Sequence, residues 1–240
     1  MSKSGVLPVD WDLLLSSAAR LQRILPEAVL VGGTAAALYA EHRVSSDADH
    51  VLVDLRDRFD EVLHELEAVT GWKEAKVTRP VQVLGSLDGI ETGVRQLIRV
   101  KPLETAILKY KGLELTVPTE AEILRIKAFL ILKRNATKDY VDFMALADHL
   151  GVEPSATALG SLDSLYPQKS GESALQQLLA QLSNALPYDL KNIDLSNYKN
   201  LDKRWNNFDK VRKAMSDIAV DIFDLRRESE NHNHPTTLKP

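Results

Sequence analysis

Short apolar runs alternate with amphipathic stretches over the first third of the chain, and this pattern predicts a mixed α/β region. Apolar residues at helical spacing over residues 10–24 predict a first helix. The apolar stretches at residues 29–31 and 47–53 predict strands. An amphipathic stretch at residues 56–70, which stops at Gly71, predicts a second long helix.

At Pro118 the pattern of apolar residues changes from one typical of strands to one typical of helices. Residues 77–117 contain strand-like pieces separated by turn signals. Thr119 and Glu122 then have the spacing of a capping box, which predicts the start of a helix. Further helices are expected at residues 138–150, 172–186 and 202–226.

These elements predict an α+β fold, with a small mixed-sheet core at residues 1–117 and a helical C-terminal domain at residues 118–229. Residues 151–171 read as a loop, and residues 230–240 as a disordered tail. The chain of 240 residues contains no cysteine, and no apolar run approaches the ~20 residues that cross a bilayer. We therefore expect a cytoplasmic protein without a membrane partner.

Two glycines and two aspartates mark the first candidate site. Gly32 and Gly33 follow the first strand, and Thr34 is placed to cap the next helix, whose free N–H groups favour an anion such as phosphate. Asp47 and Asp49 alternate on one strand, so they share a face and repel each other. A hard divalent cation, Mg²⁺ or Mn²⁺, would offset this repulsion. Each half alone is a common turn or a solvated strand end, but their order favours phosphoryl or nucleotidyl transfer.

A second candidate cluster lies in the helical half. Lys127 and Arg134 are seven residues apart, which places both cations on one face of a helix. Asp139 and Asp142, three residues apart, share a face of the following helix. The four residues favour either a site that binds a triphosphate and acts on an acceptor hydroxyl, or an ion-pair network between two packed helices.

The two motifs together carry a family resemblance. GGTAAAL followed by HRVSSDAD resembles the nucleotidyltransferase superfamily with the DNA polymerase β-type core, and within it the AbiEii/AbiGii-type toxins of bacterial toxin–antitoxin systems. RIKAFLILKRNATKDYVDFMAL resembles the later motif of that family, carried by Lys127, Arg134, Lys138, Asp139 and Asp142. The resemblance covers residues 25–150.

The resemblance implies an enzyme that moves a nucleotide from a nucleoside triphosphate to an acceptor. It implies an RNA acceptor, with tRNA as one candidate, and an antitoxin protein as partner. The expected catalytic residues are Asp47, Asp49, Lys127, Asp139 and Asp142. The expected substrate-binding residues are Gly32, Gly33, Thr34 and Arg134, and the metal ligands are Asp47 and Asp49. Lys127 is further expected to face the Asp47/Asp49 pair, and Lys127→Ala to weaken nucleotide binding with little loss of fold.

The chain departs from the family pattern at the third carboxylate. An acidic residue is expected near Gln96, and there is none. Asp88, Glu91 or Glu104 are the candidates to replace it. Without a third carboxylate, the alternative is a catalytically decayed nucleotide- or RNA-binding module on the same fold. Kinase-like phosphoryl transfer is a further alternative.

A basic stretch follows in the last quarter of the chain. Residues 191–213 contain seven basic residues, and Tyr198, Trp205 and Phe208 are interleaved with them. Such a stretch fits contact with a nucleic-acid backbone or the solvated face of a helix, and we favour the helix.

Overall fold

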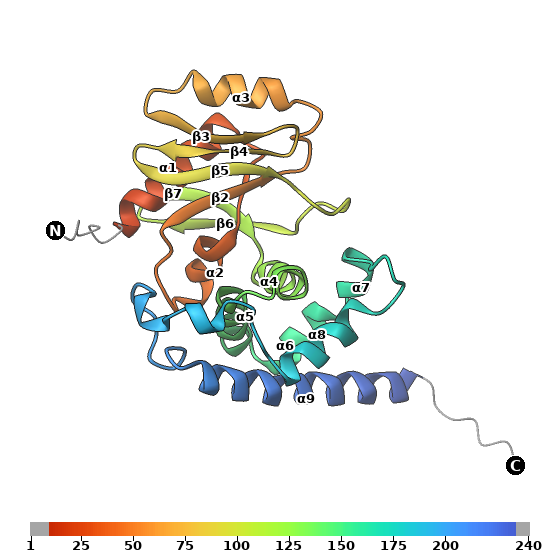
Figure 1. Ribbon diagram of the computed structural model, residues 1–240. Coiled ribbons are helices and arrows are strands. Elements are labelled where there is room, and N and C mark those ends of the chain that lie inside the picture. Colours follow the sequence, from red (N-terminus) through yellow and green to blue (C-terminus); the bar gives the residue numbers. More distant parts are fainter. Residues whose placement is uncertain (1–9, 234–240) are drawn as a thin grey trace, which may run out of the picture. The chain divides into compact units, whose positions relative to one another are not determined.

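In the computed structural model, residues 10–233 are described, with side chains through residue 228. The chain divides into two compact units. The first unit runs up to Thr119 and also includes Asn197–Leu201, and the second contains Glu120–Ser196 and the chain from Asp202 onward (Figure 1). Within residues 10–233, no helix is both long and apolar enough to cross a membrane.

The first unit holds a five-stranded mixed sheet and a separate two-stranded sheet. Its elements are α1 (Trp11–Ile24), β1 (Val29–Leu30), α2 (Gly32–Ala40), β2 (Asp47–Leu52), α3 (Phe59–Glu67), β3 (Trp72–Thr78), β4 (Gln82–Leu87), β5 (Ile90–Gln96), β6 (Thr105–Tyr110) and β7 (Leu113–Pro118). The large sheet has the order β1-β2-β5-β4-β3, in which β2 and β5 are parallel and the other pairs antiparallel. The small mixed sheet expected from the sequence is confirmed.

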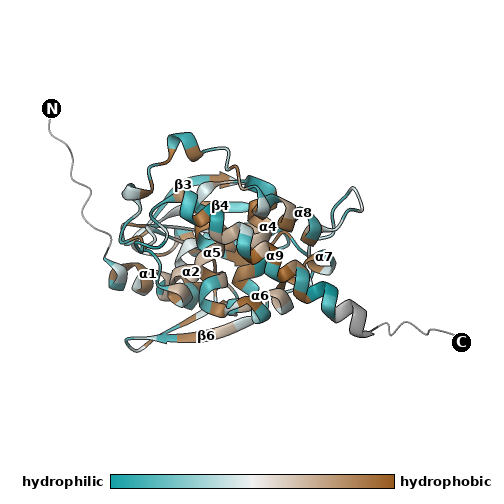
Figure 2. Ribbon diagram, turned by 90° about the horizontal axis from the view of Figure 1, so that it is seen from below, coloured by the Kyte–Doolittle hydropathy of each residue, from teal (hydrophilic) through white to brown (hydrophobic). Residues whose placement is uncertain are grey.

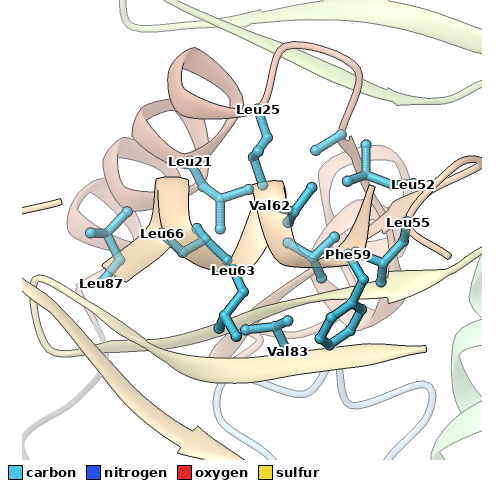
Figure 3. Close-up of a cluster of buried hydrophobic side chains, with 12 residues drawn as sticks. Leu21, Leu25, Leu52, Leu55, Phe59, Val62, Leu63, Leu66, Val83 and Leu87 are labelled. Atoms are coloured by element: carbon cyan, nitrogen blue, oxygen red, sulfur yellow. The ribbon is translucent and has the colours of Figure 1, made fainter. Parts of the chain in front are cut away.

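Helices α1 and α3 bury their apolar faces against the same face of the large sheet. Leu21 and Leu25 of α1 meet Phe59 and Leu63 of α3 over Val83 of β4 (Figure 3). The start of α1 is fixed by Asp10, whose Oδ1 accepts hydrogen bonds from the N–H groups of Asp12 and Leu13 at 2.9 and 3.3 Å. Because side chains alternate along a strand, this packing leaves every second residue of β2 on the opposite face of the sheet.

The second unit is a group of packed helices. They are α4 (Glu120–Arg134), α5 (Thr137–Leu150), α6 (Val152–Leu159), α7 (Leu162–Leu165), α8 (Ala174–Ser183) and α9 (Phe208–Asn233), with single 3₁₀ turns at Leu190–Asn192 and Leu195–Asn197. Helix α9 buries Val211, Met215 and Ile218 on one side and carries hydrophilic residues on the other (Figure 2). This amphipathic pattern explains why α9 packs along α8.

Two details of the helical half differ from the sequence expectation. Residues 151–171 contain α6 and α7 instead of a continuous loop. Gly151 turns the chain with φ +92° between α5 and α6, and Pro154 lies in the first turn of α6, where its missing N–H costs no helical hydrogen bond.

Helix α9 begins at Phe208 instead of residue 202. Asn207 precedes it, and its side-chain oxygen accepts hydrogen bonds from the N–H groups of Asp209 and Lys210 at 2.9 and 3.2 Å. This is the arrangement of an N-terminal cap. The helix continues to Asn233, so residues 230–233 of the expected tail are helical, and residues 234–240 lie outside the described part of the chain.

A fully buried histidine is expected to make the stability of the fold depend on pH. His50 of β2 lies on the helix-covered face, and burial lowers the pKa of its imidazole from 6.5 to about 4. The unfolded chain therefore binds a proton between these values that the folded chain does not. We expect the free energy of unfolding to fall by about 3 kcal/mol as the pH drops from 7 to 4, measured by urea denaturation. His50→Leu should remove this dependence and replacement of the exposed His64 should keep it; an unchanged profile in His50→Leu would contradict the assignment.

Candidate active site

The two glycines turn the chain from β1 directly into α2. Gly32 has φ +75°, a conformation that side chains other than glycine rarely adopt. Helix α2 begins at Gly32, and its N-cap residue Val31 supplies no side-chain hydrogen bond. The N–H groups at this helix end therefore have no side-chain cap and suit an anion.

The expected capping role of Thr34 is wrong. Because the helix starts two residues earlier, Thr34 lies inside its first turn, and its Oγ1 donates to the backbone carbonyl of Asp47 at 2.5 Å. Thr34 is almost fully buried. Its hydroxyl thus ties the beginning of α2 to the strand that carries the two aspartates.

Asp47 and Asp49 lie on the face of β2 opposite the buried residues Ala48 and His50. Asp47 Oδ1 accepts a hydrogen bond from Ser45 Oγ at 2.8 Å. Asp49 Oδ1 lies 3.7 Å from Arg95 Nε. Repulsion between the carboxylates is thus offset in this structure by a hydroxyl and a guanidinium.

Glu91 is the carboxylate that adjoins this pair. In the parallel β2–β5 ladder Asp47 pairs with Glu91, so the two side chains point to the same face of the sheet. Glu91 is exposed. Asp88, by contrast, forms an ion pair with Arg20 of α1, with Oδ2 2.6 Å from Arg20 Nη1. Helix α1 packs on the opposite face of the sheet. Glu91 is therefore placed better than Asp88 to act as a third carboxylate.

The fit of this group to a metal is partial. Over the part of the chain whose side chains are described, no three His, Cys, Asp or Glu residues converge closely enough to form a metal site. Asp47, Asp49 and Glu91 supply the oxygen ligands that Mg²⁺ prefers, on one sheet face. Their chemistry suits a hard cation, but the described side chains do not come together around one point.

Arg43 lies near the start of α2, and the sequence analysis did not identify it as a site residue. A Cβ atom built on Gly33 would overlap the Arg43 guanidinium and would lie 3.0 Å from Ser45 Oγ. Arg43 therefore lies against the open start of α2, two residues before the serine that binds Asp47. The signal in the sequence is a basic residue four positions before Asp47, inside the HRVSSDAD run.

Gln96 occupies the place where an acid was expected, and its amide has another role. Its Nε2 donates to the carbonyl of Val53 at 2.7 Å, and its Oε1 accepts from the N–H of Arg56 at 2.9 Å.

A small pocket of 180 Å³ lies beside Val53 and Leu97, close to this loop. It is lined by Glu27, Val29, Val51, Val53, Leu97, Pro102, Leu103 and Thr105. Val51 follows Asp49 on the same strand face, about 7 Å further along β2, so the pocket continues the face that carries the carboxylates.

The predicted helical cluster is an ion-pair network within the second unit, in which the lysine and both aspartates are buried and Arg134 is exposed. Lys127 Nζ lies 2.6 Å from Asp142 Oδ2 and 3.6 Å from Asp139 Oδ1. Arg134 donates two hydrogen bonds to the carboxylate of Asp139, from Nη2 to Oδ1 at 2.6 Å and from Nε to Oδ2 at 2.9 Å. The Lys127 side chain is 2% exposed, and both aspartates are 0% exposed. Of the two interpretations left open by the sequence, this geometry favours the network between packed helices.

The sequence-predicted residues thus form two separate groups. Gly32, Gly33, Thr34, Asp47 and Asp49 gather in the first unit, with Arg43, Ser45 and Glu91 beside them. Lys127, Arg134, Asp139 and Asp142 gather in the second. That Lys127 faces the Asp47/Asp49 pair stays a prediction.

Comparison with known proteins gives similarity at two levels. No protein-family model matches the chain. The heme uptake protein MmpL11 of Mycobacterium tuberculosis is 28% identical to 91% of the chain, and the mycolic acid-containing lipids exporter MmpL11 of Mycolicibacterium smegmatis is 32% identical to 51% of it. The chain spans less than a quarter of the length of these curated relatives, 23% and 13% respectively.

A solved structure shares the fold. A crystal structure from H. pylori, whose name assigns it to the nucleotidyltransferases, covers 98% of this chain and 100% of its own, with a TM-score of 0.54 and 15% sequence identity. The fold is that of a nucleotidyltransferase.

Proposed function

We propose that this protein is a metal-dependent nucleotidyltransferase, which moves a nucleotide from a nucleoside triphosphate to an acceptor hydroxyl. The observation that carries the proposal is that the start of α2 lies beside Asp49 and the Arg43 guanidinium, on the strand face that also carries Asp47. Glu91 pairs with Asp47 on the neighbouring strand. The fold shared with a nucleotidyltransferase supports it.

Positively charged groups and backbone N–H groups bind the phosphates in this proposal, and the carboxylates bind the metal or accept a proton. The backbone N–H groups at Gly32 and Gly33 and the guanidinium of Arg43 bind the phosphates. Asp47 and Asp49 would hold Mg²⁺ or Mn²⁺, and the bound ion would supply positive charge to the reacting phosphate. Glu91, as the exposed carboxylate of the group, is placed to accept a proton.

The reaction follows from this arrangement. The acceptor oxygen forms a bond to the α-phosphorus, the bond from that phosphorus to the leaving oxygen breaks, and pyrophosphate leaves. The acceptor proton passes to a carboxylate. Lys127 and Arg134, in their network with Asp139 and Asp142, hold α4 and α5 together.

The biological role is proposed from the family resemblance. We propose that the acceptor is an RNA, with tRNA as one candidate, and that the protein acts in the bacterial cytoplasm as the toxin of a toxin–antitoxin pair restrained by an antitoxin protein. The basic residues before and in α9 are partly paired, since Arg204 binds Asp148 and Arg212 binds Asp209, at 2.6 and 2.5 Å. The exposed lysines of this stretch remain for contact with RNA phosphates.

A binding module without catalysis is the second candidate. The absence of a converged three-carboxylate site among the described residues favours it, and so does the similarity to part of a much longer transport protein. In that case the first unit would bind a nucleotide without transferring it.

Incubation with each labelled nucleoside triphosphate, Mg²⁺ and total RNA tests the proposal. We expect label on RNA and release of pyrophosphate, both abolished by a chelator. Release of nucleoside diphosphate instead would favour kinase-like phosphoryl transfer. Binding of nucleotide without any product would favour the binding module.

A further inference from the structure

A short segment from the C-terminal half belongs to the first unit. Residues Asn197–Leu201 begin at the last residue of the second 3₁₀ turn and precede α9, yet they group with the sheet unit and not with the helices on either side of them. The sequence gives no sign of this, because the segment lies in a basic stretch far from both motifs.

The segment attaches next to the candidate phosphate site. The N–H of Val44 donates to the carbonyl of Lys199 at 2.8 Å. One residue earlier, the Arg43 guanidinium lies over the Tyr198 ring, 5.9 Å from its centre. Both contacts fall on the connection between α2 and β2, which carries Arg43, Ser45 and Asp47.

The contacts form a continuous series from the segment to the site. The Arg43 guanidinium lies over the Tyr198 ring and against Gly33 at the start of α2. Ser45, which also lies beside Gly33, donates a hydrogen bond to Asp47. An arginine side chain has many rotamers, and ordering it opposes ligand binding unless another contact already holds it. A ring under one side of the guanidinium attracts it and restricts its motion without accepting a hydrogen bond from its N–H groups.

We propose that Tyr198 is a positioning residue, which holds Arg43 in the orientation that binds the phosphates of the substrate. The inference rests on the proposed function, because it names a residue that prepares the same site. Tyr198 itself makes no contact with the substrate in this proposal. Lys199 takes part through its backbone carbonyl, so its ammonium group is not required.

Binding of inorganic triphosphate, measured by calorimetry with Mg²⁺ present, tests the inference apart from catalysis. We expect Tyr198→Ala to weaken triphosphate binding roughly three- to tenfold, which is the effect of losing one contact between a cation and an aromatic ring. Arg43→Ala should weaken it more, roughly thirtyfold, because it removes charge-assisted hydrogen bonds. Tyr198→Phe keeps the ring and should bind like the wild type.

Three control variants separate positioning by the Tyr198 ring from effects of charge and folding. Tyr188→Ala removes a tyrosine that is 73% exposed in the second unit and should leave binding unchanged. Lys199→Ala keeps the backbone carbonyl and should also bind like the wild type, whereas a loss there would show that the segment acts through its charge. In the double variant with Arg43→Ala, Tyr198→Ala should have no further effect. Thermal unfolding of each variant checks that the fold is kept.

The outcomes distinguish this inference from the proposed function. Suppose that Tyr198→Ala binds triphosphate more weakly but the wild type transfers no nucleotide. This result would support the inference and contradict the proposed enzymatic activity. Where transfer occurs, Tyr198→Ala should raise KM for the triphosphate and leave kcat nearly unchanged. Equal triphosphate binding by wild type and Tyr198→Ala, or no binding by either, would overturn the inference.

Discussion

Asp47→Asn is expected to reduce nucleotide transfer by roughly a thousandfold while the protein stays folded. The substitution removes one carboxylate from the proposed metal site, and a bound metal contributes several kcal/mol to stabilising the transition state, at about 1.4 kcal/mol per tenfold. Asp47 shares its strand face with Asp49 and pairs with Glu91, so removing its charge also relieves repulsion. The free energy of unfolding should therefore stay the same or rise.

The measurement is incorporation of labelled nucleotide into RNA, with urea denaturation of the same samples. Asp57→Asn is the matched control, because Asp57 is an exposed aspartate beyond the end of β2. Its activity and stability should both match the wild type. Metal-dependent transfer by Asp47→Asn at the wild-type rate, or unfolding of this variant, would reject the metal-site interpretation.

Lys127→Ala is expected to lower the free energy of unfolding by about 3–5 kcal/mol, the usual effect of removing one partner of a buried ion pair. Asp142 is fully buried, and its Oδ2 lies 2.6 Å from Lys127 Nζ. The truncation leaves this carboxylate without its nearest cation. The structure thus revises the sequence expectation that Lys127→Ala costs little stability.

Urea denaturation measures this effect, and a second variant tests its cause. Lys127→Met combined with Asp142→Leu replaces the pair by apolar side chains of similar size and should recover most of the lost stability. Lys138→Ala, an exposed lysine at the start of α5, should change stability little. A Lys127→Ala protein with wild-type stability and weakened nucleotide binding would instead support a substrate-binding role for this lysine.

The sequence determined those parts of the fold that depend on local patterns. The periodicity of residues 10–24 predicted α1, and the spacing of apolar residues predicted β2 and the mixed sheet. Signals that break a pattern were less reliable. Residues 151–171 were expected to form a loop, but Gly151 and Pro154 are compatible with the start of a helix, so α6 was missed.

For the candidate site, the sequence alone determined that Gly32, Gly33, Asp47 and Asp49 lie near one another, because two short connections join β1, α2 and β2. Only the tertiary structure decided what surrounds them. Glu91 adjoins Asp47 through the parallel pairing of β2 with β5, more than forty residues apart in the chain. Tyr198 reaches Arg43 from the far end of the sequence. Strand pairing and packing between distant segments depend on the burial of the whole unit, and no local spacing of residues encodes them.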